Sequence, residues 1–317
     1  MSKKSVVILI IAAIFTIAGG IVLALTIGSY IKNANANMIT NNYVVEDAYN
    51  KISIDVKTIN IEIVSSEDDK TRIDVVEEEK IHHTYKVENN TLIIGVEDNT
   101  TWKDHIGFHF GTMKLTLSIP NASYEELIVK VSTGDITLNG TYSFKDVNIK
   151  LSTGDVIVKT NVENMLTIET STGDQTLEDI NVKKAHLEAS TGKINIKNVV
   201  FSDEVSLKTT TGNKTLTNVK APSMEIHAST GKTTLNQTVI EGNLLIDVTT
   251  GDIKFNKSDA GTIDITTSTG DVRGSLLTPK TFAIDHHTGD AKVPPTSGGL
   301  CKIKTDTGDI VITIESE

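Results

Sequence analysis

Aspartate recurs at one position of a short repeat, and these regularly spaced carboxylates are the residues most suited to chemistry. The column that follows each Thr-Gly pair is Asp135, Asp155, Asp174, Lys193, Asn213, Lys232, Asp252, Asp271, Asp290 and Asp309. Carboxylate oxygens are the ligands that calcium prefers. Asp252, Asp271, Asp290 and Asp309 form the longest unbroken run and are therefore the calcium candidates.

A structural role for the same column is the favoured interpretation. Asp after Gly suits a tight turn, because its carboxylate accepts hydrogen bonds from nearby backbone. The glycine-rich nonapeptide of calcium-binding solenoids is missing from the sequence. We therefore expect no resident metal and no cofactor, with a calcium ladder as the alternative.

The sequence carries no recognisable catalytic motif. Gly-x-Ser-x-Gly, His-Glu-x-x-His, Cys-x-x-Cys and the phosphate-binding loop are all missing. His286-His287 interrupts the Ser-Thr that usually precedes the glycine, and strand parity predicts His286 toward the core and His287 toward solvent. His82, His83, His105, His109 and Trp102 gather upstream without metal-ligand spacing, and we expect them in exposed loops. The sequence predicts no catalytic residue and no enzyme.

Ten glycines mark the period of the repeat. They are Gly134, Gly154, Gly173, Gly192, Gly212, Gly231, Gly251, Gly270, Gly289 and Gly308, spaced by 19 or 20 residues. A fixed short period predicts a solenoid of stacked coils. Each glycine is expected to allow a tight turn at one corner.

Apolar columns flank each turn and predict the interior of the coil. The residues seven and five positions before each glycine are apolar in every repeat, as in Leu127 and Val129. The residue four positions after is apolar except at Gly274. Alternation with polar residues predicts strands with one buried face. By the same parity, the Thr before each glycine is expected to face inward.

The expected fold is all-β: a single-stranded β-solenoid of about ten coils over residues 127–317. Residues 43–126 are strand-like but out of register with the repeat, and they are expected to cap its start. The acidic Glu315-Ser-Glu317 is expected to protect the other end from strand addition.

One uncharged segment precedes these strands. Residues 5–31 are long enough to cross a bilayer, and Lys3 and Lys4 predict that residues 1–4 are cytoplasmic. Residues 32–42 are polar and are expected to be a flexible linker. The alternative is a signal peptide cleaved near Ala36, but the apolar run exceeds the usual signal length. We expect a single-pass protein in the cell membrane with an extracellular domain.

The charge and the cysteine content exclude one class of partner and one kind of cross-link. The 317-residue chain has a formal net charge of −11, which argues against nucleic acid. Cys301 is the only cysteine, so no internal disulfide can form.

The repeated Ser-Thr-Gly-Asp with flanking aliphatic strands, and Leu117-Ser-Ile-Pro120 before it, resemble a bacterial family. This is the putative-adhesin β-strand-repeat family, which includes LiaG-like proteins, and the resemblance covers roughly residues 45–317. It implies a β-helical cell-surface domain without catalytic residues to carry over. Lys193, Asn213 and Lys232 depart from the family's Asp.

Three functions remain open at this point. The first is a non-enzymatic surface protein, an adhesin or envelope scaffold that contacts a cell-wall polymer or another surface protein. The second is an accessory protein in envelope-stress sensing. The third is a polysaccharide-active enzyme, since β-helices also host lyases and hydrolases, but such enzymes need convergent carboxylates in a cleft.

Overall fold

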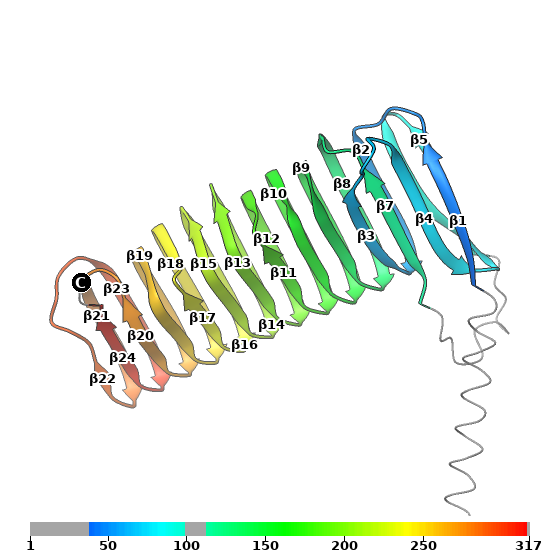
Figure 1. Ribbon diagram of the computed structural model, residues 1–317. Coiled ribbons are helices and arrows are strands. Elements are labelled where there is room, and N and C mark those ends of the chain that lie inside the picture. Colours follow the sequence, from blue (N-terminus) through cyan, green and yellow to red (C-terminus); the bar gives the residue numbers. More distant parts are fainter. Residues whose placement is uncertain (1–37, 99–111, 316–317) are drawn as a thin grey trace, which may run out of the picture.

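The computed structural model describes residues 38–98 and 112–315, and every regular element in these ranges is a β-strand (Figure 1). The expected anchor at residues 5–31 lies outside the described residues, as do His105, His109 and Trp102. Within the described ranges, no helix is long and apolar enough to cross a membrane.

The strands stack into one elongated solenoid whose ten Thr-Gly corners bound about nine turns (Figure 1). Each coil has a strand that runs toward the Thr-Gly corner and a strand that leaves it. We call the sheet of incoming strands the first face and the sheet of outgoing strands the second face. The all-β solenoid is confirmed.

The first face follows the rod from one end to the other. Its order is β5 (Ile81–Glu88), β6 (Thr91–Asp98), β2 (Lys51–Thr58), β8 (Ser123–Thr133), the later parts of β9 (Ile136–Thr153) and β10 (Val156–Thr172), β12 (Asn181–Thr191), β14 (Glu204–Thr211), β16 (Ser223–Thr230), the later parts of β18 (Val239–Thr250) and β19 (Ile253–Thr269), β23 (Gly299–Thr307) and β21 (Lys280–Thr288). All of these neighbours pair in parallel except β5 and β6.

The second face runs beside it. Its order is β1 (Met38–Val45), β4 (Thr71–Glu78), β7 (Lys114–Ile119), β3 (Asn60–Ser65), the early parts of β9 and β10, β11 (Gln175–Glu178), β13 (Ile194–Phe201), β15 (Lys214–Ala221), β17 (Thr233–Asn236), the early part of β19, β20 (Val272–Leu276), β24 (Ile310–Ile314) and β22 (Ala291–Lys292). Only β1–β4 and β4–β7 are antiparallel.

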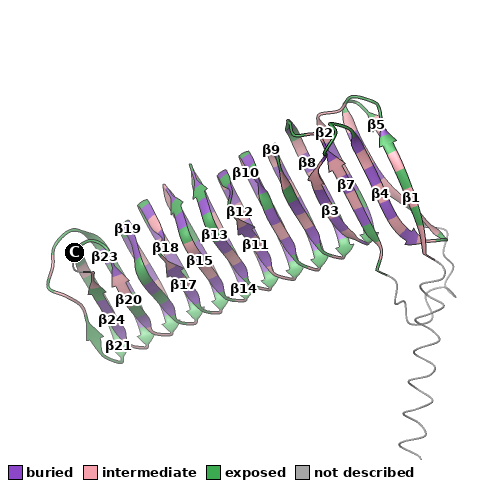
Figure 2. Cartoon of the chain, in the orientation of Figure 1, coloured by how far each residue is buried: buried purple, intermediate pink, exposed green. Residues whose placement is uncertain are grey.

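The predicted apolar columns form the core. Buried residues alternate with exposed ones along each strand, and the turns are exposed (Figure 2). The columns five and seven positions before the glycines are buried in nine of the ten coils. The exceptions, Phe282 and Ile284, belong to one coil and are only partly buried. Stacking therefore seals a narrow interior, and each buried aliphatic side chain contributes about 1.5–3 kcal/mol before ordering entropy.

The threonine before each glycine does not face inward. Thr133, Thr153 and their equivalents are exposed in all ten coils, contrary to the parity argument. The alternation breaks at the last two residues of the strand, because the residue two before the glycine and the threonine are both exposed. The inward places at the corner belong instead to the residues three before and two after each glycine, such as Val131 and Ile136.

The N-terminal region is more solenoid-like than its sequence suggested. β2 and β3 form a coil that pairs in register with the first repeat, Thr58 beside Thr133, with Ile59 in place of glycine. β6 and β7 add a coil outside it, and antiparallel β1, β4 and β5 cover the end. Strand β1 begins at Met38, so residues 38–42 are paired strand and do not belong to a flexible linker.

The last two coils are stacked in reverse order of sequence. β19 pairs with β23, and β23 pairs with β21, so the final coil lies between its two predecessors. The terminal coil is 280–292, and the acidic C-terminus does not protect the end of the rod. Pro294 and Pro295 explain this order, because proline cannot donate to an interior ladder. His286 at the end stays exposed, whereas Thr305 takes the buried place beside Thr267.

A buried lysine fixes the reversed order. The Lys280 ammonium lies 2.7 Å from Asp259 Oδ1 and donates to the carbonyl of Ala260 at 2.7 Å. It reaches these groups past the intervening Gly299, where a Cβ would come within 2.2 Å of the Gly261 carbonyl oxygen. The terminal coil is thus tied to the coil beyond its neighbour.

Candidate functional site: the corner and the first face

The corner glycines allow very close stacking of coils. At Gly134 φ is 134°, a conformation that residues with a Cβ rarely adopt. At Gly212 the requirement is space, because a Cβ there would lie 1.7 Å from the carbonyl oxygen of Gly192. The predicted turn role of the glycines agrees with this geometry.

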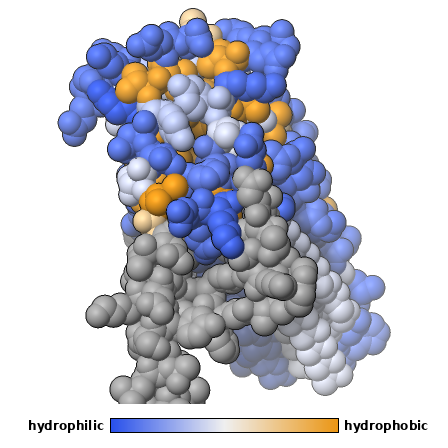
Figure 3. Space-filling view, turned by 90° about the vertical axis from the view of Figure 1, so that its right-hand side faces the viewer, coloured by the Kyte–Doolittle hydropathy of each residue, from blue (hydrophilic) through white to orange (hydrophobic). Residues whose placement is uncertain are grey.

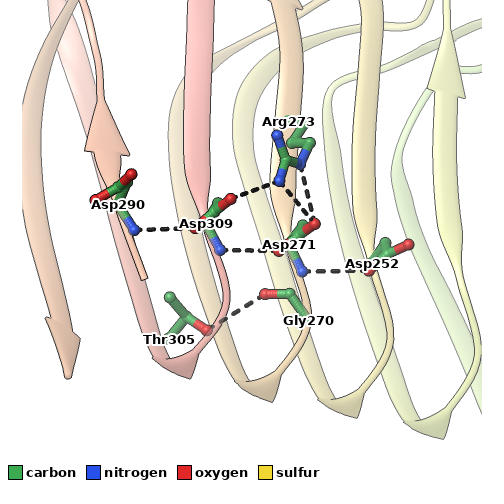
Figure 4. Close-up of polar contacts among 7 residues, drawn as sticks. All are labelled: Asp252, Gly270, Asp271, Arg273, Asp290, Thr305 and Asp309. Atoms are coloured by element: carbon green, nitrogen blue, oxygen red, sulfur yellow. Dashed lines mark hydrogen bonds and ion pairs between the residues drawn. The ribbon is translucent and has the colours of Figure 1, made fainter. Parts of the chain in front are cut away.

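The aspartates after the glycines bond the next coil. Asp155 N donates to Asp135 Oδ1 at 2.9 Å, and Asp174 N donates to Asp155 Oδ1 at 2.7 Å. The same contact joins Asp252 to Asp271, Asp271 to Asp309 and Asp309 to Asp290 (Figure 4). Each carboxylate therefore satisfies a backbone N–H that the parallel ladder leaves free at the corner. The expected local backbone bond is instead a bond between coils.

Lysine interrupts this ladder twice. The backbone N–H groups of both lysines still donate to the preceding coil, Lys193 N to Asp174 Oδ1 and Lys232 N to Asn213 Oδ1. Their own side chains offer no acceptor, and within the described chain no side chain accepts from Asn213 N or Asp252 N. Asn replaces Asp without loss because its amide oxygen accepts the same bond.

The four calcium candidates lie along one corner, and both carboxylate oxygens of Asp271 and Asp309 are engaged. The ladder uses one oxygen of Asp252, Asp271 and Asp309. Arg273 bonds the other oxygen of Asp271 at 3.0 Å and of Asp309 at 2.7 Å (Figure 4). The Asp290 N–H bond and Arg273 lower the pKa of Asp309. Among the described residues, no group of three or more His, Cys, Asp or Glu could hold a metal ion. At Asp271 and Asp309, calcium would have to displace Arg273.

Hydroxyl groups line the first face beside the corner. The residues two before the glycines are Ser132, Ser152, Ser171, Ser190, Thr210, Ser229, Thr249 and Ser268, then Asp306 and His287 in the last two coils. All of them are exposed. Within the described part of the chain, the eight hydroxyls make no side-chain hydrogen bond, so they are open to water or a ligand. They repeat about every 4.8 Å.

Two grooves run along this face. One, of about 450 Å³, is lined by Ser132, Ser152, Ser171 and Ser190 with Lys130, Lys150, Glu169 and Glu188. The other, of about 710 Å³, lies nearer the starts of the incoming strands and is lined by residues from Met165 to Asp264, including Met165, His186, Glu225 and Leu245. Both cross several coils, so an occupant would lie along the rod.

Charges on both faces pair between neighbouring coils. Lys150 lies 3.0 Å from Glu169, and Lys208 lies 3.0 Å from Glu188. On the second face, hydrogen bonds from Lys159 and Lys197 lower the pKa of Glu178 to about 2. Exposed pairs of this kind contribute little stability but keep the faces mixed in sign.

Two buried lysines, Lys214 and Lys280, were missed in the sequence. Lys214 is fully buried at the inward position after Gly212, where its ammonium donates to Thr209 Oγ1 at 2.9 Å. Burial lowers its pKa to about 8. Lys280 is the second. The sequence did contain a signal for the burial of Lys214. It stands two residues after the corner glycine, a position that Ile136 and Val156 occupy in earlier coils. Burial also raises the pKa of the Cys301 thiol to about 12.

Among the residues that the structure describes, the histidines do not gather at one site. His286 and His287 are both exposed, so the inward prediction for His286 is wrong. His287 Nδ1 lies 3.5 Å from Asp306. His82 and His83 lie in strand β5 and not in a loop. His83 is buried, and its Nδ1 lies 2.6 Å from the buried Glu77 carboxylate.

The family follows from the match of the repeat region. A family model described as Toastrack DUF4097 matches residues 49–254 and 200–293. The chain belongs to the Toastrack DUF4097 family. This confirms the resemblance to the adhesin-like repeat proteins.

Solved structures resemble the chain at low identity. A putative adhesin from Bacteroides fragilis is 15% identical over 87% of this chain and 97% of its own, with a TM-score of 0.45. A putative adhesin from Parabacteroides distasonis is 14% identical over 87% and 97%, also at 0.45. A putative lipid binding protein from Parabacteroides distasonis is 16% identical over 85% and 98%, at 0.42. No curated protein matches the sequence.

Proposed function

We propose that this Toastrack protein is a non-enzymatic rod on the cell surface, anchored by residues 5–31. Its first face would bind an extended cell-wall polymer. The observation that carries the proposal is the ladder of eight exposed hydroxyls, which have no side-chain partner among the described residues and lie beside grooves that cross several coils. A polymer with repeating hydroxyl or amide groups can bond such a ladder many times, so weak contacts add.

The charge of the chain supports this choice of partner. A formal net charge of −11 disfavours nucleic acid and other polyanions. The paired Lys and Glu on the first face leave it mixed in sign, which suits a neutral or zwitterionic polymer. The carboxylates follow the repeat and do not converge in one cleft, which argues against glycoside hydrolysis.

The location is tested by labelling cysteine on intact cells. Cys301 is buried and its thiol pKa is raised to about 12, so the natural chain should stay unlabelled. Ser171→Cys places a thiol on the exposed first face. We expect a membrane-impermeant maleimide to label Ser171→Cys on intact cells. Labelling only after lysis would contradict an extracellular rod.

The binding is tested by sedimentation of the full chain, in detergent micelles, with purified cell walls. Ser152→Trp with Ser171→Trp fills the groove on the first face. The matched control, Thr176→Trp with Asn195→Trp, adds the same bulk to half-buried positions of the second face. We expect the first pair to weaken binding at least about tenfold, or about 1.4 kcal/mol. Equal binding by both pairs would contradict a role for the first face.

A further inference from the structure

The terminal strand β21 has a free edge. It pairs in parallel with β23 along one side, and among the described residues no strand pairs with its other side. That side faces out of the end of the rod (Figure 1). A strand at the edge of a sheet presents a row of unpaired backbone N–H and C=O groups, which is a template for another strand.

The contacts of Lys280 show which residues of β21 have their backbone groups on the free side. Thr296 Oγ1 accepts from Lys280 N at 3.3 Å and donates to Lys280 O at 2.9 Å, so a loop and not β23 satisfies this residue. Along a strand, the N–H and C=O of alternate residues point to the same side. Phe282, Ile284 and His286 therefore have their donors and acceptors on the free side, whereas the residues between them bond β23.

The interior of the rod is also incompletely covered at this strand. Phe282 and Ile284 are only partly buried, whereas the same columns are buried in the other nine coils. At the opposite end, the rings of Tyr43 and Tyr85 meet 5.3 Å apart between β1 and β5. Figure 3 looks onto that opposite end, where hydrophilic side chains surround a few apolar patches. A strand added to β21 would cover Phe282 and Ile284 if it had apolar side chains at alternate positions.

A complete coil of a second rod does not fit onto this end. The outgoing half of the terminal coil is short, because β22 has two residues and is followed by Val293, Pro294 and Pro295. Proline has no backbone N–H to offer to a neighbouring strand. The loop that follows β22 also passes outside the terminal coil (Figure 1). Only the incoming half of the coil can pair, which suits a single extended strand.

The charge beside the free edge favours a basic partner. Asp285 is exposed and, within the described residues, forms no ion pair. Its register partner on β23 is the exposed Lys304, so the existing neighbour already places a cation beside it. Opposite charges on adjacent strands stabilise their pairing. A second neighbour with a lysine or arginine beside Asp285 gains the same contact.

We propose that the free edge of β21 binds an extended segment of another protein as an added strand. The backbone of the segment bonds Phe282, Ile284 and His286, its apolar side chains cover the end of the core, and a basic residue lies beside Asp285. Main-chain hydrogen bonds supply affinity in this mode of recognition, and the alternate side chains supply specificity. The proposal uses only the end of the rod, so it stands or fails independently of polymer binding along the first face.

The probe is a fluorescein-labelled peptide that copies residues 299–307 with Cys301→Ala. This sequence already pairs with the other side of β21, with Lys304 beside Asp285. Fluorescence anisotropy with the full chain in detergent micelles is expected to show saturable binding, with a dissociation constant on the order of 0.1 mM. A scrambled peptide of the same composition is expected to bind at least about tenfold more weakly.

Two variants separate the backbone from the charge. His286→Pro removes one N–H from the free side and should weaken the peptide at least about fivefold, whereas His286→Ala keeps this donor and should not. Circular dichroism checks that both variants stay folded. Asp285→Lys should also weaken the peptide at least about fivefold, and a peptide with Lys304→Glu should recover the affinity for this variant.

Three results would overturn the proposal. The first is no saturable binding of the peptide. The second is equal affinity of the peptide for His286→Pro, His286→Ala and Asp285→Lys. The third comes from sedimentation velocity without peptide: dimers of the natural chain that are lost in His286→Pro would assign the edge to a second copy.

Discussion

The backbone N–H of Asp155 donates a 2.9 Å hydrogen bond to the carboxylate of Asp135 in the preceding coil. This bond explains why Asp or Asn recurs after the corner glycine. The parallel ladder pairs the backbone on both sides of this position, as in Gly134 N to Thr153 O and Ile136 N to Asp155 O, but leaves its own N–H to a side chain. The acidic column is thus a structural element that repeats with the coil.

Removing one carboxylate from the column should weaken the rod. Asp155→Ala leaves Asp174 N without its acceptor, and we expect the free energy of unfolding to fall by about 1 kcal/mol. Asp155→Asn keeps an acceptor and should be nearly neutral. Urea unfolding followed by circular dichroism measures both. Equal destabilisation by Ala and Asn would show that the bond is unimportant.

Adding an acceptor where lysine interrupts the column should stabilise the rod. Lys193→Asn supplies an acceptor opposite Asn213 N, where the described chain offers none. We expect a gain of about 0.5–1 kcal/mol in the same measurement. A loss would indicate that the Lys193–Asp174 ion pair, at 3.7 Å, outweighs the new bond.

A side chain at Gly212 should be poorly tolerated. In Gly212→Ala the Cβ would meet the Gly192 carbonyl oxygen at 1.7 Å, so two coils must separate. We expect a loss of about 2–4 kcal/mol, the range of overpacking and strain. Gly95→Ala is the control, because a Cβ there meets nothing within 4 Å. Similar unfolding midpoints for the two variants would contradict the close stacking at the corner.

Lys214 should make stability rise with alkaline pH. Its pKa falls from 10.5 to about 8 in the folded chain, so between these values the unfolded chain binds the extra proton. Stability from this group therefore increases as pH rises from about 8 to 10.5, by about 3 kcal/mol in total. Lys214→Met should be more stable than the natural chain at pH 7, and this difference should shrink by pH 10. A difference independent of pH would show that the ammonium is not desolvated.

Loss of the Lys280 ammonium should release the terminal coil. Lys280→Met leaves Asp259 buried without its ion partner, which typically costs about 3–5 kcal/mol. We expect limited proteolysis to cleave first within residues 277–298. Lys280→Met combined with Asp259→Leu removes both charges and should restore most of the resistance. Equal protease sensitivity of the single and double variants would count against this ion pair as the tie.

The regular part of the solenoid was predictable because the same residue types recur at fixed positions in each repeat. Gly at the corner and the aliphatic columns at fixed offsets, such as Leu127 and Val129, give both the coil and its core. Those signals are local, and every repeat restates them.

The ends were harder because their pairing is not in sequence order. Nothing in the period distinguishes a coil stacked on its predecessor from one inserted before it. The signals were present as exceptions: Pro294 and Pro295 cannot enter an interior ladder, and His286 does not fit a buried column. At the other end, Ile59 replaces glycine, which concealed the coil formed by β2 and β3.

The candidate sites were less accessible still. The hydroxyl ladder could be predicted from the repeat, but a pocket at the capped end is lined by Tyr49, Asp69 and Tyr124, which come from three separate segments. Parity also failed at the corner threonines, because the last two residues of each incoming strand are both exposed and break the alternation.

The ladders, the grooves and the ion pairs between coils depend on which coils are neighbours, and paired cysteines measure this directly. Thr266 and Lys304 are register partners on the first face in the reversed stacking, about 4.8 Å apart, within reach of a disulfide. Thr266 and Asp285 are then two coils apart, at about 9.6 Å, beyond that reach. With Cys301→Ala as background, we expect Thr266→Cys with Lys304→Cys to form a disulfide in high yield. A disulfide in Thr266→Cys with Asp285→Cys, and none in the first pair, would contradict the stacking.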